Sequence, residues 1–215
     1  MFTYKNYQLK VFESIKDYFR FLNNYSKSDA FELMKKQNSL GSNPYVDIFD
    51  SCASVCLRVP TGGGKTVMAA HAIKDVSDEL NNESPIVLWL TPSDTIRTQT
   101  LDALKKHGHP YRLAIANTYG DNFKICDLED LQTINTLDID SSCIVIVSTI
   151  QAFNVTETAK RSVYSFSEDL APHFDNLSPI ETEKLEKVSA ADLGSQPYLT
   201  QKDIGRIKFS IANWL

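Results

Sequence analysis

The stretch Pro60-Thr-Gly-Gly-Gly-Lys-Thr66 decides how this chain folds, because it joins two regular elements through a glycine-rich turn. The apolar residues 54–59 before it predict a buried strand, and the residues from Lys65 to about Leu80 predict a helix. Glycine adopts positive φ angles and carries no Cβ, so backbone N–H groups can converge on closely spaced phosphate oxygens. The positive end of the following helix favours the same anions. The sequence therefore predicts a strand, a phosphate-binding loop and a helix, in that order.

Two side chains of this loop have separate chemical roles. Lys65 reaches the β- and γ-phosphates of a nucleotide, and the Thr66 hydroxyl is a ligand for Mg²⁺, so both are candidate catalytic residues. The usual phosphate-loop pattern begins with a glycine, where this chain has Val59. The alternative is a glycine-rich turn with an incidental lysine. The candidates for nucleotide binding in the loop are Thr61, Gly62, Gly63, Gly64, Lys65 and Thr66.

The rest of the chain alternates between strand-like and helix-like segments. Continuous apolar runs predict buried strands, and recurrence at three- and four-residue steps predicts helices. Such alternation is typical of βαβ units, so we expect an α/β fold with a mostly parallel sheet, preceded by N-terminal helices. The expected strands are residues 54–59, 86–90, 111–116 and 143–147, and the expected helices are residues 7–21, 30–36, 65–80, 94–106 and 203–215.

Composition and charge exclude several classes of protein. The 215 residues are 42% hydrophobic and 23% charged, as in an ordinary soluble globular chain. No apolar run is long enough to span a membrane and the N-terminus lacks a secretory signal, so we expect a cytoplasmic protein with no membrane contact. The net charge of −5 excludes a protein that wraps DNA by charge alone. The four cysteines form no CxxC pair, which favours reduced thiols over a metal site or disulfides.

The loop and its setting resemble motif I of superfamily 2 helicases, in a variant without the leading glycine. The chain is most similar to the N-terminal RecA-like ATPase domain of DEAD/DEAH-box enzymes, and among these to the type III restriction enzyme helicase/endonuclease subunit family. This resemblance implies a three-layer RecA-like domain with ATP and Mg²⁺ as cofactors. It also implies DNA as a partner, together with a second RecA-like domain and a methyltransferase or specificity subunit.

Near the N-terminus, Tyr7-Gln8 opens a helix and resembles the Q motif of these helicases, about 57 residues before Lys65. The resemblance implies that Gln8 reads the adenine edge of ATP, with Phe2 or Tyr4 as stacking partners. The alternative is an ordinary polar residue at the start of a helix.

Two further segments follow the ends of expected strands and resemble helicase motifs that contact nucleic acid. Residues 90–99 resemble motif Ia, although Asp94 stands where an arginine is common, and residues 146–153 resemble the motif after the fourth strand. Because ligands of parallel sheets lie at the carboxyl ends of strands, we expect both segments at the same sheet edge as the phosphate loop. The alternative is that they only cap helices. The residues implied in nucleic-acid binding are Thr91, Pro92, Ser93, Arg97, Thr149 and Gln151.

The resemblance divides the chain into two parts. Residues 1–50 are an N-terminal helical segment with the Q-like motif, and residues 51–215 are the first RecA-like ATPase domain, with a weakly patterned insertion at about 154–203. Residues 205–215 resemble the stretch before the acidic DEAH-type motif, which does not follow. We therefore expect a piece of a larger enzyme that is inactive on its own.

The expected function is that of an ATP-binding domain in an ATP-dependent DNA helicase or translocase, as part of a restriction endonuclease. Two alternatives stay open at this point. One is a phosphate-loop ATPase unrelated to nucleic acid, and the other is a non-catalytic interaction module that retains a phosphate loop.

Overall fold

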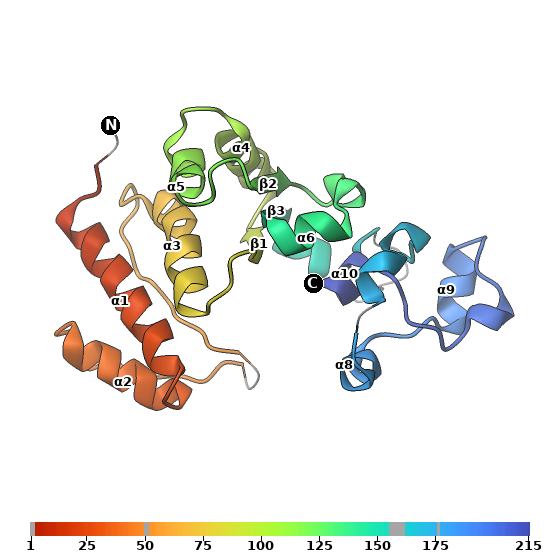
Figure 1. Cartoon of the computed structure of the whole chain (residues 1–215), viewed down its shortest axis with the longest axis horizontal. Coiled ribbons are helices and arrows are strands. Elements are labelled where there is room, and N and C mark those ends of the chain that lie inside the picture. Colours follow the sequence, from red (N-terminus) through yellow and green to blue (C-terminus); the bar gives the residue numbers. More distant parts are fainter. Residues whose placement is uncertain (1–2, 50–51, 155–161, 176) are drawn as a thin grey trace. The chain divides into compact units, whose positions relative to one another are not determined.

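The computed structural model describes residues 3–49, 52–154, 162–175 and 177–215 (Figure 1). Two compact units divide the chain, and each combines segments that are distant in sequence. The first unit contains the residues up to 85 and residues 103–123, and the second contains residues 86–102 and 124–215. Phe2, an expected stacking partner of the base, lies outside the described residues. None of the described helices is long and apolar enough to cross a membrane.

The first unit consists of helices and the extended chain that leads into the phosphate loop (Figure 1). Its helices are α1 (Asn6–Leu22), α2 (Lys27–Gln37), α3 (Lys65–Glu79) and α5 (Pro110–Tyr119). α1 packs against both α2 and α3, and α3 also packs against α5. The buried face of α1 carries Phe12, Ile15 and Tyr18, whose three-residue spacing matches the helical period of the sequence.

Residues 54–59 run as extended chain and do not form the strand that the sequence predicts. In the described part of the chain the sheet consists of three other strands, and none of them pairs with this segment. Val55 and Leu57 are accordingly 37% and 43% exposed. Strand formation depends on cross-strand neighbours more than on apolar sequence, so the prediction of a buried strand here is wrong.

The strand predicted for residues 111–116 is also wrong, because these residues lie inside α5. Pro110 occupies the first turn of this helix, where its fixed φ angle suits the helix and its missing N–H has no helical partner to lose. The His109 side chain caps the helix, since its Nδ1 accepts a hydrogen bond from the Tyr111 N–H at 3.3 Å. Pro110 and the His109 cap both favour the start of a helix, and together they outweigh the β-like composition of residues 111–116.

The second unit contains the sheet, whose described strands follow the order β1-β3-β2. The strands are β1 (Ile86–Thr91), β2 (Phe123–Cys126) and β3 (Cys143–Thr149), and β2 begins at the boundary between the two units. β1 and β3 run parallel, with Ile86 opposite Ile144 and Thr91 opposite Thr149. Residues 143–148 are all buried, as an unbroken apolar run predicts for a central strand. The prediction of an α/β fold with parallel strands is confirmed.

The remaining described elements of the second unit are short, apart from α4 (Asp94–Lys105), which has twelve residues and enters the first unit at Ala103. The other α-helices are α6 (Thr136–Ser141), α7 (Ile150–Phe153), α8 (Pro179–Lys184), α9 (Ala190–Ser195) and α10 (Ile211–Trp214). The 3-10 helices are Asp130–Thr133, Ser162–Tyr164, Glu168–Phe174 and Gln201–Asp203. The single helix predicted for residues 203–215 is wrong. Gly205 has a φ of +87°, and Ile207 pairs with Lys187 in an antiparallel bridge, so regular helix is confined to α10.

A buried ion pair joins two segments of the C-terminal region. Lys208 is 2% exposed, and its Nζ lies 2.7 Å from Oδ1 of Asp192. The other carboxylate oxygen of Asp192 accepts hydrogen bonds from the N–H and the hydroxyl of Ser189, both at 2.8 Å. Both oxygens of this buried carboxylate are therefore satisfied within the protein.

Candidate functional site

The phosphate loop has the backbone geometry that its glycines predict. Gly62 and Gly64 have φ angles of +77° and +78°, a region that residues with a Cβ rarely adopt. The Gly63 N–H donates to the Pro60 carbonyl at 3.0 Å, which closes the turn. Gly64 is the N-cap of α3, so the loop ends at the positive end of a fifteen-residue helix. The loop can therefore present backbone N–H groups to an anion.

Lys65 covers the mouth of this loop with its own side chain. The exposed ammonium donates hydrogen bonds to the carbonyls of Val59 at 3.1 Å and Pro60 at 3.3 Å. A phosphate oxygen is a stronger acceptor than a neutral carbonyl, so a bound polyphosphate would compete for this ammonium. Thr66 follows in the first turn of α3 and is half-buried.

Gln8 lies against the loop, and its side chain is bonded within the protein. It is 5% exposed, its Nε2 donates to the Gly63 carbonyl at 3.2 Å, and its Oε1 accepts from the Lys5 N–H at 2.9 Å. Sequence reasoning missed Tyr7, whose hydroxyl donates to the same Gly63 carbonyl at 2.7 Å. Adjacency to Gln8 at the start of α1 was the available signal. The start of α1 therefore holds the centre of the phosphate loop.

Replacing Gly63 by alanine is expected to distort the loop. The new Cβ would lie 2.5 Å from Cγ1 of Val59 and 2.9 Å from the Pro60 carbonyl oxygen, and the second of these is backbone. We expect the free energy of unfolding to fall by about 1 kcal/mol, the lower end for overpacking, because the loop is exposed. Chemical denaturation measures this, and Gly41→Ala is the matched control, since nothing lies within 4 Å of its Cβ position. Equal destabilisation by both variants would argue against this loop geometry.

The two strand-end segments, residues 91–93 and 148–151, meet in the second unit at the carboxyl ends of β1 and β3. The Gln151 Nε2 donates to the Pro92 carbonyl at 2.9 Å and bridges them. Thr91 is 2% exposed, and its hydroxyl lies 3.1 Å from the Ser148 carbonyl and 3.2 Å from that of Ser93. The buried Thr91 hydroxyl thus bonds the two segments to each other and is not accessible to solvent.

Arg97 is paired with carboxylates. Its guanidinium lies 2.8 Å from Asp94 and 3.5 Å from Asp127, and the hydrogen bond that it donates to Asp94 is the main cause of its raised pKa. Ser93 caps α4, as its Oγ accepts from the Ile96 N–H at 3.4 Å, and Thr149 is the half-buried N-cap of α7. The pairing of Arg97 with two carboxylates limits its capacity to neutralise a phosphate.

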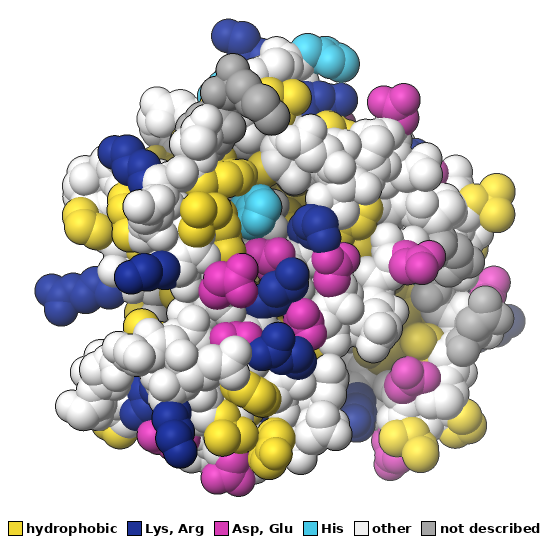
Figure 2. Space-filling model, turned by 60° about the vertical axis from the view of Figure 1, so that its left-hand side comes forward, with side chains coloured by type: hydrophobic (Ala, Val, Ile, Leu, Met, Phe, Trp, Pro, Cys, Tyr) yellow, Lys and Arg dark blue, Asp and Glu magenta, His cyan; other side chains and the backbone are white. Residues whose placement is uncertain are grey.

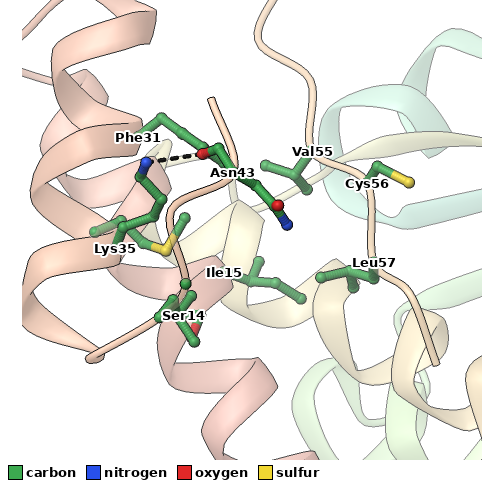
Figure 3. Close-up of a pocket in the computed structure, with 11 residues that line it drawn as sticks. Ser14, Ile15, Phe31, Lys35, Asn43, Val55, Cys56 and Leu57 are labelled. Atoms are coloured by element: carbon green, nitrogen blue, oxygen red, sulfur yellow. Dashed lines mark hydrogen bonds between the residues drawn. The ribbon is translucent and has the colours of Figure 1, made fainter. Parts of the chain in front are cut away.

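A separate apolar cavity of about 160 Å³ lies in the first unit, between α1, α2 and the extended chain before the loop (Figure 3). Val55 and Leu57 point toward Ile15 of α1, and the Lys35 ammonium donates to the Asn43 carbonyl at 2.8 Å beside it (Figure 3). No residue of the phosphate loop lines this cavity. It is therefore distinct from the candidate nucleotide site.

Comparisons with known proteins give one match. No curated protein and no solved structure matches the chain. The family model described as type III restriction enzyme, res subunit, matches residues 1–178, which is most of the chain. The α/β fold, the parallel strands and the phosphate loop agree with a RecA-like, DEAD-like helicase domain. The chain therefore belongs to the family of the type III restriction enzyme res subunit.

Proposed function

We propose that this chain binds ATP and Mg²⁺ at the loop of residues 60–66, as the first RecA-like domain of a DNA helicase or translocase within a restriction enzyme. The observation that carries the proposal is the loop itself. Two glycines at positive φ lead into the N-terminus of α3, and Lys65 lies over the turn. Family membership supports the same assignment.

Each loop residue has a defined task in this proposal. The N–H groups of Gly62, Gly64, Lys65 and Thr66 donate to phosphate oxygens, while the Gly63 N–H keeps its bond to the Pro60 carbonyl. The Lys65 ammonium leaves the carbonyls of Val59 and Pro60 to bind the β- and γ-phosphates. The Thr66 hydroxyl is the one Mg²⁺ ligand that the loop offers, and a bound Mg²⁺ neutralises phosphate charge. The loop fits a bound nucleotide, because nothing lies within 4 Å of the Cβ position of Gly62 and the Lys65 side chain is exposed.

For the base, we propose that Gln8 faces the adenine edge. Its carboxamide has two N–H donors and an oxygen with two lone pairs, and each end makes one hydrogen bond within the protein. One donor and one lone pair therefore remain for a base. Its contact with Gly63 places it next to the phosphate loop.

For DNA, we propose a weak contact with backbone phosphates that does not read sequence. Ser93, Thr149 and Gln151 offer backbone groups and polar side chains, which position a strand without distinguishing bases. Thr91 and Pro92 hold the two segments together beside them. Lys and Arg side chains are interleaved with Asp and Glu on the face shown in Figure 2. The negative net charge opposes a purely electrostatic contact.

A fluorescent ATP analogue with Mg²⁺ tests nucleotide binding. We expect saturable binding that ATP displaces more effectively than GTP or tripolyphosphate, because only ATP offers both the phosphates and the adenine edge. The measurement is fluorescence anisotropy with unlabelled competitors. Failure of millimolar ATP to displace the analogue would refute the proposal.

The alternative of an ATPase without a nucleic-acid partner is favoured by one observation, the pairing of Arg97 with Asp94 and Asp127. Titration of a labelled single strand at several salt concentrations separates the two functions. Binding that weakens with salt supports the helicase assignment, and absence of binding at low salt supports the alternative.

A further inference from the structure

One face of the N-terminal segment contacts α3 at two places. Gln8 and Phe12 are spaced by four residues on α1, and Tyr4, which precedes the helix, packs against Phe12 with 5.0 Å between the ring centroids. Gln8 contacts the loop at Gly63, while Tyr4 and Phe12 both contact His71 of α3. The start of α1 is thus attached both to the loop and to the helix that follows it.

The His71 imidazole is enclosed by these two rings. Its centroid lies 4.1 Å from that of Phe12 and 5.0 Å from that of Tyr4, and its Nδ1 lies 3.3 Å from the Tyr4 hydroxyl. The other ring nitrogen, Nε2, lies 3.7 Å from Oδ2 of Asp75. These contacts fix the orientation of the ring.

Asp75 supplies a second observation at this cluster. Its residue is 5% exposed, and its Oδ2 makes no hydrogen bond to any described residue. A buried carboxylate oxygen without a donor is unfavourable, and Nε2 of His71 lies 3.7 Å away, across a short gap. A small shift would close this gap.

Burial favours a neutral imidazole at His71. Burial lowers the pKa of His71, opposed by Asp75 and supported by Lys74 and Lys16, and burial raises the pKa of Asp75. A neutral ring with its hydrogen on Nε2 donates toward Asp75 and accepts from the Tyr4 hydroxyl at Nδ1. The imidazole therefore links a buried residue of α3 to the segment before α1.

We propose that His71 is a positioning residue for the nucleotide site, which fixes the segment of Tyr4 to Gln8 and through it the Gly63 carbonyl of the phosphate loop. His71 itself does not reach the loop and acts through Tyr4, Tyr7 and Gln8. The inference rests on the proposed nucleotide binding. It adds that the shape of the loop depends on a hydrogen bond made two turns along α3.

The test uses Tyr4→Phe, which removes only the hydroxyl, His71→Phe, which keeps an aromatic ring, and the double variant. Each single variant is expected to weaken ATP binding about two- to tenfold, the effect of one neutral hydrogen bond. The double variant is expected to be no weaker than the worse single one, because both remove the same bond. Calorimetric titration with Mg²⁺-ATP measures the affinities.

Amide hydrogen exchange of Gly63 is the second readout, compared with that of Ile115 in α5 of the same unit, because general destabilisation would raise both and opening of the loop only the first. The Gly63 N–H donates to Pro60, so faster exchange in the Tyr4 and His71 variants reports opening of the loop. Tyr198→Phe is the matched control, because its hydroxyl donates to the Phe166 carbonyl in the second unit. It is expected to change neither readout.

The outcomes separate the two proposals. If ATP binds equally to wild type and both single variants, and Gly63 exchange is unchanged, His71 is not a positioning residue while ATP binding stands. If the wild-type chain binds no ATP, the proposed function fails. Gly63 exchange then still decides whether His71 sets the loop, with unchanged exchange overturning the link and faster exchange supporting it.

Discussion

Replacing Lys208 by methionine is expected to lower the free energy of unfolding by about 3–5 kcal/mol, the effect of breaking a buried ion pair from one side. Methionine fills much of the same volume, so the main change is the loss of the ammonium. The Asp192 carboxylate would then stay buried without its cation, 2.7 Å from where the ammonium lies now. Urea denaturation followed by fluorescence of the tryptophans measures the change. Arg206→Met is the control, because Arg206 pairs with Asp203 at the surface, and its effect is expected to be much smaller.

The same ion pair predicts a pH dependence. Burial alone would raise the pKa of Asp192, but the hydrogen bonds from Lys208 and Ser189 lower it below the usual value. A lowered folded-state pKa contributes stability that is present above the unfolded-state pKa, about 4, and is lost as the pH falls through the folded-state value. The difference between wild type and Lys208→Met is therefore expected to be full at neutral pH and to shrink as the pH falls toward the lowered folded-state pKa of Asp192. A difference that grows on acidification would contradict this account.

Replacing Lys65 by alanine is expected to weaken ATP binding about ten- to hundredfold, which corresponds to about 1.5–3 kcal/mol for a hydrogen bond to a charged group. In the absence of nucleotide its ammonium touches only the carbonyls of Val59 and Pro60 at the surface. The free energy of unfolding is therefore expected to change by less than about 1 kcal/mol. Calorimetric titration with Mg²⁺-ATP separates the loss of affinity from any loss of stability.

Lys74→Ala is the matched control for Lys65→Ala. Lys74 belongs to the same helix and pairs with Asp78 at the surface, away from the loop. It is expected to leave ATP affinity unchanged. Equal affinity of wild type and Lys65→Ala would remove the lysine from the proposed site, and equal losses in both variants would indicate a nonspecific effect of charge.

The sequence predicts those parts of the fold that depend on local signals. The unbroken apolar run of residues 143–147 lies in the buried strand β3, and the glycines before Lys65 lie at positive φ where α3 begins. Both features follow from neighbouring residues alone: a run with no polar position has no face for solvent, and a turn of this shape excludes side chains. The α/β class could therefore be predicted.

The predictions that are wrong concern segments whose structure is decided by pairing with a distant strand or by one or two flanking residues. Residues 54–59 have strand-like composition but no paired neighbour in the structure, and pairing is a long-range property. The helix in place of a strand at residues 111–116 is decided by Pro110 and the cap of His109. In the candidate site, proximity of Gln8 to the loop could be expected from the resemblance. The bond from Tyr7 to Gly63 goes beyond the resemblance, which gives a role only to Gln8, and the adjacency of Tyr7 to Gln8 was its one signal.

The Gly63 carbonyl accepts hydrogen bonds from both Tyr7 and Gln8. These bonds also orient the Gly64 N–H, which belongs to the same peptide group. In a trans peptide the N–H points opposite to the C=O, so fixing the Gly63 oxygen also fixes the direction of the Gly64 N–H. That donor faces away from α1 before any anion arrives. The Gly64 peptide group is already ordered when the protein folds. A ligand that accepts a hydrogen bond from it therefore binds without a further entropy cost for ordering this group. The hydroxyl of Tyr7 and the side-chain amide of Gln8, both in α1, thereby preorganise the Gly64 N–H, to which neither of them bonds.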